Sequence, residues 1–212
     1  RSYRELVNAP TIAQMWAQMS QEVAVGQYLD VYQSTLPLEN TPDALASALS
    51  VVRHKSGRYS VEHPLALGAA IGGGSDELVT QLRQVGAALG EAFQMRDDDL
   101  GVFGDPAKTG KPAGDDLREG KRTPLIALTL QRANPAQLAL LQRHLGDATI
   151  TAEIVEQLQE VIEHSGARAA HEELIDHRRH LALSLLEEIP DAQGEGIAAV
   201  RHLAHQLTDR RS

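Results

Sequence analysis

Three consecutive carboxylates, Asp97, Asp98 and Asp99, stand near the end of a mostly apolar segment. Neighbouring carboxylates repel one another, and enclosing them in a cleft raises that cost, so a bound cation is a favourable partner. Magnesium takes oxygen ligands, keeps several water molecules and commonly bridges one or two carboxylates to phosphate oxygens. These residues alone support two interpretations about equally, a magnesium–phosphate site and a solvated acidic helix end. The second is made less favourable because acidic groups at a helix C-terminus oppose the helix dipole.

Lysines elsewhere in the chain could neutralise phosphate. Lys55 precedes Ser56 near the end of an expected helix, and Lys111 and Lys121 lie in the glycine-rich tract 104–122. An ammonium group acts on phosphate as a point charge. The tract lacks the glycine spacing and the preceding strand of a Walker A motif. Each lysine alone is more often a solvated surface residue, but together with the acidic cluster they indicate a metal and a phosphate group.

Three segments resemble the trans-polyprenyl diphosphate synthases in residue order and spacing. The second aspartate-rich motif of that family and the loop after it are similar to FQMRDDDLGVFGD (93–105), TGK (109–111) and DLREGKRT (116–123). The family's Gly-Gln-x-x-Asp segment is similar to VGQYLD (25–30), and its Lys-Ser/Thr segment to HKSGRY (54–59). The resemblance covers residues 19–130, and beyond them only the helical character matches.

The resemblance implies an isoprenoid synthase-type helical bundle around a central cavity. In this family an allylic diphosphate ionises with the help of Mg2+, and the carbocation alkylates isopentenyl diphosphate, giving here a product of farnesyl or geranylgeranyl length. It also implies a homodimer. Carried over by position, the expected roles are a direct metal ligand (Asp97), a supporting or water-mediated one (Asp98), contacts to the leaving diphosphate (Lys55, Lys111, Lys121), contacts to the allylic substrate or metal waters (Gln27, Gln94) and a lining of the reacting region (Ser56).

The chain departs from the family pattern in two ways. Gly101 stands where the motif often has its third aspartate, and no second Asp-Asp-x-x-Asp occurs in the sequence. We therefore expect residues 1–212 to be the C-terminal portion of a single polyprenyl synthase domain, with the N-terminal helices and the isopentenyl-diphosphate site absent, and to be inactive alone.

Two alternative functions share this fold. A class I terpene synthase is disfavoured because its Asn-x-x-x-Ser/Thr-x-x-x-Glu metal motif is absent. A non-catalytic subunit of a heteromeric synthase is disfavoured because a purely structural subunit would not need Lys55, Asp97, Lys111 and Lys121.

Composition limits the choice of partners. The 20 basic residues are outnumbered by 29 acidic ones, and the net charge of −9 argues against a nucleic acid or a strongly anionic membrane as the main partner. Cysteine is absent, which excludes disulfides and thiol chemistry. No apolar run reaches the roughly 20 residues that span a bilayer. We expect a cytoplasmic protein with no membrane insertion.

Hydrophobic periodicity predicts helices nearly throughout and no strand. The expected helices cover residues 11–32, 42–56, 61–71, 75–100, 124 onward, 135 onward, 151–164, 167–188 and 194–208, with an irregular loop over 104–122. Small and polar residues gather on one side of the helix over 75–100, and we expect this side to border a cavity: Gly86, Gly90, Gln94, Asp97 and Gly101. The nine histidines are expected at the surface.

Overall fold

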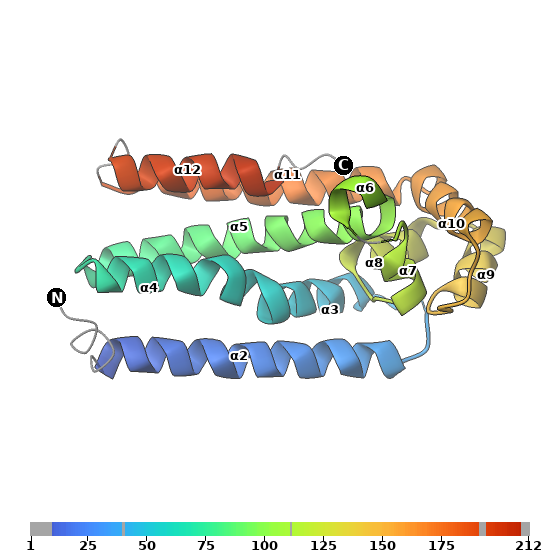
Figure 1. The fold of residues 1–212 in the computed structure, drawn as a ribbon, viewed down its shortest axis with the longest axis horizontal. Helices are drawn as coiled ribbons and strands as arrows, with labels where there is room; N and C mark the ends of the chain where they lie inside the picture. The colour runs from blue at the N-terminus through green and yellow to red at the C-terminus, as the bar shows by residue number, and fades with distance from the viewer. Residues whose placement is uncertain (1–9, 40, 111, 191–193, 209–212) are drawn as a thin grey trace.

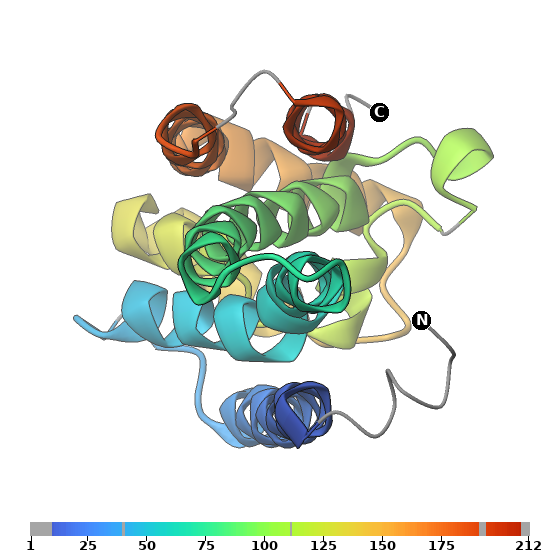
Figure 2. The ribbon, with the colours of Figure 1, turned by 90° about the vertical axis from the view of Figure 1, so that its left-hand side faces the viewer.

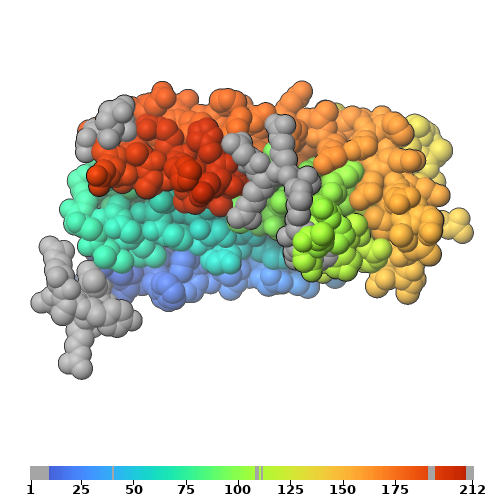
Figure 3. Space-filling view, turned by 45° about the horizontal axis from the view of Figure 1, so that its top comes forward, coloured from blue at the N-terminus to red at the C-terminus, as the bar shows by residue number. Residues whose placement is uncertain are grey.

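The computed structural model describes residues 10–39, 41–110, 112–190 and 194–208, and over these ranges it contains helices and no strand. The all-α class is therefore confirmed. Figures 1 and 2 show layers in the order α2, then α3 with α4, then α5, then α11 with α12. Figure 3 shows α11 and α12 covering one face, and α8 to α10 gather at one end in Figure 1. No described helix is long and apolar enough to cross a bilayer.

The helix bounds are α2 Pro10–Thr35, α3 Ala44–Val51, the π-helix η1 Val52–Glu62, α4 His63–Ile71, α5 Asp76–Phe103, α6 Pro106–Thr109, α7 Asp115–Glu119, α8 Pro124–Arg132, α9 Pro135–His144, α10 Ala152–His164, α11 Ala167–Glu187 and α12 Glu195–Thr208. The two short helices α6 and α7 correct the expectation of an irregular loop over 104–122. Both begin where the sequence supplies a turn, after Asp105 and after Gly114.

Helix α5 is the central element because it packs against both η1 and α11. Ser75 caps it by accepting a hydrogen bond from the Leu78 amide, and two acidic residues in the first turn favour the helix dipole. Leu82, Val85 and Leu89 bury one side. The helix extends to Phe103, three residues beyond the expected end, so the three aspartates lie inside its last two turns.

The segment that carries Lys55 does not end there as expected. The helical backbone continues from α3 through η1 into α4, although the widened turns of η1 replace ordinary α-helical bonding. The expected start at Thr41 and Pro42 is also wrong, because α3 begins at Ala44 and Asp43 makes no capping bond. A π-helix of this kind often marks a functional site.

Glycines hold η1 tightly between α2 and α5. A Cβ atom at position 90 would lie 2.7 Å from the carbonyl carbon of Gly57, and one at position 26 would lie 2.5 Å from the Cα of Lys55. The side of α5 that carries Gly86 and Gly90 is thus filled by the backbone of η1. The expectation that these two glycines border a cavity is wrong, because close helix packing uses the space that the missing side chains leave.

Helix α2 presents a largely uncharged face to solvent. Its charged residues, Glu22 and Asp30, both form ion pairs with η1. Trp16 is 61% exposed, whereas the neighbouring Met15 is buried. Tyr28 is also exposed.

Candidate functional site

A small pocket of about 60 Å3 collects most of the residues that the sequence singled out. Lys55 and Ser56 reach it from η1, Gln94 and Asp98 from α5, and Lys121 from the segment after α7. These elements are far apart in the chain, and their meeting depends on the glycine contacts between η1 and α5 described above. Five of the eight predicted site residues therefore line one pocket.

Hydrogen bonds and ion pairs fix the polar groups of this pocket. The Lys55 Nζ atom lies 2.5 Å from the Asp30 carboxylate of α2, and Gln94 donates a 2.9 Å hydrogen bond to Asp98. Lys121 pairs with Asp116 of α7. Each lysine that lines the pocket is thus held by a carboxylate from another element.

Among the described residues, the buried Asp98 carboxylate has no ion pair, whereas Asp30 and Asp116 are each paired with a lysine. Burial, together with the negative charges of Asp116 and Asp97, raises the pKa of Asp98 to about 7 against the opposing effects of Gln94 and Lys121. The Asp98 Oδ2 atom is buried and has no hydrogen-bond partner among the described residues. Burial also raises the pKa of Asp116. A cation would relieve this repulsion.

A magnesium ion fits this donor set if phosphate and water complete its shell. Among the described residues no three histidine or acidic side chains converge tightly enough to hold a metal by themselves. Magnesium commonly binds through one or two carboxylates and substrate phosphates, so a preformed protein cage is not required.

Comparison with known proteins identifies the family. The model of the polyprenyl synthetase family matches residues 1–162, more than half of the chain. The chain belongs to the polyprenyl synthetase family. It is 35% identical over 146 residues to a geranylgeranyl diphosphate synthase of Saccharolobus solfataricus, and 29% identical over 181 residues to a farnesyl pyrophosphate synthase of Bos taurus.

A crystal structure of another polyprenyl synthetase agrees with the fold. Geranylgeranyl pyrophosphate synthase of Corynebacterium glutamicum, solved with isoprenyl diphosphate and magnesium, superposes with a TM-score of 0.86 at 41% identity and covers 94% of this chain. The chain spans 44% of the Saccharolobus relative, 50% of the bovine one and 55% of the Corynebacterium structure. It therefore corresponds to about half of these polyprenyl synthetases.

The other predicted site residues lie outside the pocket or outside the described structure. Asp97 is exposed on α5, one residue before Asp98. Gln27 is also exposed and does not line the pocket, although Asp30 on the next turn of α2 does. Lys111 lies outside the described residues, so its expected contact to a diphosphate stays a prediction.

Two acidic residues of the site were not assigned a role from the sequence. Asp30 belongs to the segment that resembles Gly-Gln-x-x-Asp, but the ion pair with Lys55 could not be foreseen from its spacing. Asp116 is buried against Gly101, where a Cβ atom would lie 2.8 Å from the Asp116 Oδ1 atom and closer still to Oδ2. The carboxylate of Asp116 therefore occupies the space beside the position that often carries the family's third aspartate.

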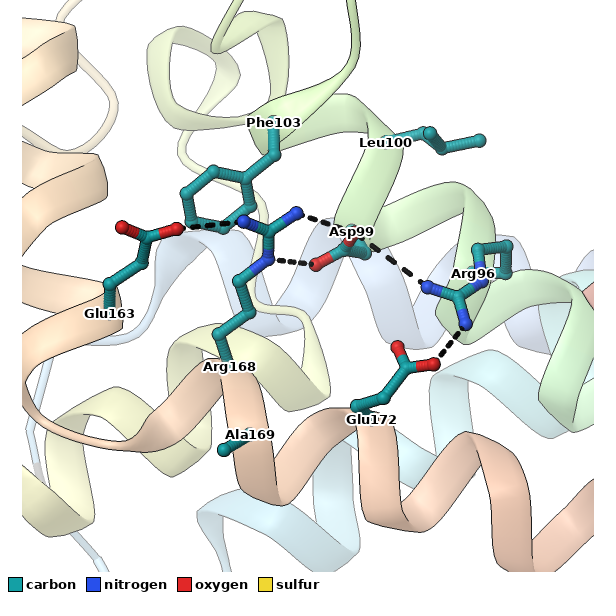
Figure 4. A pocket seen from close by; sticks show the side chains of 8 residues that line it. All are labelled: Arg96, Asp99, Leu100, Phe103, Glu163, Arg168, Ala169 and Glu172. Atoms are coloured by element: carbon teal, nitrogen blue, oxygen red, sulfur yellow. Dashed lines mark hydrogen bonds and ion pairs between the residues drawn. The ribbon is translucent and has the colours of Figure 1, made fainter. Parts of the chain in front are cut away.

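A second hollow lies on the opposite side of α5 (Figure 4). Asp99 faces it and binds Arg168 of α11 at 3.0 Å, and the Arg168 guanidinium lies over the Phe103 ring. Arg96 donates hydrogen bonds to Glu172 and to the Thr208 carbonyl. The third aspartate of the cluster thus anchors α11 to α5 and does not face the pocket.

The expectation that all nine histidines lie at the surface is wrong. His63 is fully buried and its Nε2 atom lies 2.7 Å from the Glu22 carboxylate, which joins α2 to the start of α4. His171 is 1% exposed between α11 and α5. Single histidines in a polar-rich helical sequence give no periodic signal that would separate these two from the others.

His171 predicts an acid-dependent loss of stability. Burial lowers its pKa to about 4, although Asp99 and Glu172 oppose that effect and Arg96 and Arg168 reinforce it. As the pH falls below about 6.5, the histidine is protonated in the unfolded chain before it is protonated in the folded one, so the unfolded state is favoured. Between pH 7.5 and 4.5 this one group should remove about 2–3 kcal/mol from the free energy of unfolding.

The measurement is urea unfolding of the chain and of His171→Gln at both pH values. Both proteins keep all carboxylates, so the difference between their losses reports His171 alone, and the wild-type chain should lose about 2–3 kcal/mol more than the variant. Equal losses would contradict the assignment.

Proposed function

We propose that this chain carries the diphosphate- and metal-binding part of a trans-prenyltransferase, which joins an allylic diphosphate to isopentenyl diphosphate. The observation that carries the proposal is the convergence of Lys55, Gln94, Asp98 and Lys121 in one pocket within the polyprenyl synthetase fold. The relatives that it matches include geranylgeranyl and farnesyl diphosphate synthases, which supports a short-chain isoprenyl diphosphate as product.

In this proposal Lys55 and Lys121 bind the leaving diphosphate and stabilise the charge that develops on it. Asp97 would hold Mg2+, with Asp98 and Asp116 in support. Bound magnesium would supply Lewis-acid stabilisation of the leaving group. Gln94 orients Asp98 through the hydrogen bond described above, and Ser56 lines the reacting region beside Lys55.

We propose a homodimer as the assembly and the cytoplasm as the location. The dimer is supported by the outward face of α2, where Trp16, Tyr28 and Val31 are each more than half exposed. Exposed apolar residues gathered on one helix are typical of a surface that another protein covers.

The proposed metal site predicts magnesium-dependent binding of pyrophosphate. Inorganic pyrophosphate should bind the 212-residue chain more tightly with Mg2+ than with EDTA. Asp97→Asn should weaken the magnesium-dependent binding at least tenfold, the lower end of the range for lost metal-supporting groups. Isothermal titration calorimetry measures both affinities.

Asp76→Asn is the matched control, because Asp76 is an exposed aspartate in the first turn of the same helix. It should leave pyrophosphate binding unchanged. Equal affinity of Asp97→Asn and the wild-type chain would remove the basis of the proposal. The chain alone is expected to show no turnover of radiolabelled isopentenyl diphosphate with an allylic co-substrate, and turnover would contradict the expectation that it is inactive alone.

A further inference from the structure

A mostly apolar groove of about 440 Å3 runs beside the pocket, between the end of α2, the segment that leads to α3, and α8. Its aliphatic and aromatic wall consists of Leu29, Tyr32, Leu36, Leu38, Ile126 and Leu130. The volume falls within the range of sites that hold small organic molecules, about 300–1,000 Å3. The apolar part of the wall suits a hydrocarbon chain, and the remaining wall carries polar side chains, Gln33, Glu39, Thr41, Ser47, Arg122 and Thr123.

Arg122 lies where the groove meets the pocket and lines both of them. Its Nη2 atom donates a 3.1 Å hydrogen bond to the Leu36 carbonyl, whereas its Nη1 atom is buried and has no partner among the described residues. Lys55 and Lys121, by contrast, are each paired with a carboxylate. Burial lowers the pKa of Arg122, which reflects the same lack of compensation.

A buried N–H group without an acceptor costs free energy that an arriving acceptor would recover. Guanidinium matches phosphate oxygens in geometry and charge. The groove therefore offers one anion-binding group at its inner end and an apolar wall along its length.

We propose that the groove and Arg122 form a second site for an isoprenyl diphosphate, with the hydrocarbon tail in the groove and the phosphate on Arg122. The choice of ligand rests on the proposed function, but the site needs no metal ion. An allylic substrate and a longer product share this chemistry, and the tail length that binds more tightly distinguishes them.

Calorimetric titrations in EDTA test the proposal, with geranyl diphosphate, geranylgeranyl diphosphate and inorganic pyrophosphate as probes below their micellar concentrations. At least one of the two isoprenyl diphosphates should bind, and pyrophosphate should bind at least tenfold more weakly because it lacks the tail. Arg122→Gln should weaken isoprenyl diphosphate binding about tenfold. Ser47→Phe, at an exposed position of the groove wall, should abolish the advantage over pyrophosphate by filling the groove.

Two variants serve as controls. Arg132→Gln removes an exposed arginine of α8, and Ala46→Phe adds the same ring at an exposed position of α3 outside the groove wall. Both should bind like the wild-type chain. Asp97→Asn should also bind isoprenyl diphosphate in EDTA like the wild-type chain. This result would show that the groove binds its ligand independently of the metal site, even if the proposed function fails.

Unchanged binding by Arg122→Gln or Ser47→Phe would overturn the proposal. So would binding that requires Mg2+ and disappears in Asp97→Asn, because the ligand would then occupy the metal site. Light scattering tests a third outcome, in which the wild-type chain is a dimer and Ser47→Phe is the one variant of this set that is a monomer. That result would assign the groove to a second copy of the chain and overturn the proposal as well.

Discussion

Replacing Gly90 with alanine should lower the free energy of unfolding by about 3 kcal/mol and greatly weaken binding of magnesium pyrophosphate. The new methyl group would lie 2.8 Å from the Gly57 Cα atom and closer still to the Gly57 carbonyl oxygen. These are backbone atoms, so a side-chain rotation cannot relieve the overlap and η1 must move away from α5. That movement would separate Lys55 and Ser56 from Gln94 and Asp98.

Gly68→Ala is the control for this effect. Gly68 lies inside α4, and a Cβ atom there would meet nothing within 4 Å. Alanine should therefore raise the free energy of unfolding by about 0.5–1 kcal/mol through helix propensity. Chemical denaturation of both variants, with pyrophosphate titration at a temperature where each is folded, measures the two effects. A Gly90→Ala protein as stable as Gly68→Ala would contradict the close packing of η1.

Restoring the family's third aspartate with Gly101→Asp should weaken binding of magnesium pyrophosphate at least tenfold. The added side chain needs the space that the Asp116 carboxylate occupies, and it would displace Asp116 from Lys121. It would also add a negative charge beside two carboxylates whose pKa values are already raised. Like charges at this distance are costly until a cation binds.

The double variant Gly101→Asp with Asp116→Gly tests whether binding needs a carboxylate at residue 116 or only one carboxylate in the space that the two residues share. It returns the number of carboxylates to that of the wild-type chain, with one of them now on α5. Binding should then recover at least partly relative to Gly101→Asp, as isothermal titration calorimetry would show. If Gly101→Asp alone binds as tightly as the wild-type chain, Asp116 does not fill the place of the missing aspartate.

The sequence was sufficient for the helical class and for most of the pocket. The predicted starts at residues 124 and 135 agree with α8 and α9, where Thr123 and Asn134 each precede a proline and accept capping hydrogen bonds from the first turn. Motif order pointed to Lys55, Gln94, Asp98 and Lys121, which converge. These predictions succeed because capping depends on adjacent residues and because the family resemblance carries long-range information with it.

Predictions that depended on what fills a space were less successful. A row of glycines can border a cavity or admit another backbone, and only the position of η1 decides between them for Gly90. Likewise, Asp116 lies 15 residues after Gly101, and its burial depends on how α7 folds back against α5. Local spacing contains no information about such contacts.

The widened turns of η1 also constrain how this segment can change in length. Because α3, η1 and α4 form one uninterrupted helical path, every residue in η1 sets the rotation of the residues after it. Removing one residue would rotate the residues after it relative to Gly26 and Gly90, on which η1 packs, by up to about 100°, the rotation per residue of an ordinary α-helix. Substitutions at exposed positions leave that rotation intact. Over evolution this stretch should therefore accumulate replacements much more readily than insertions or deletions.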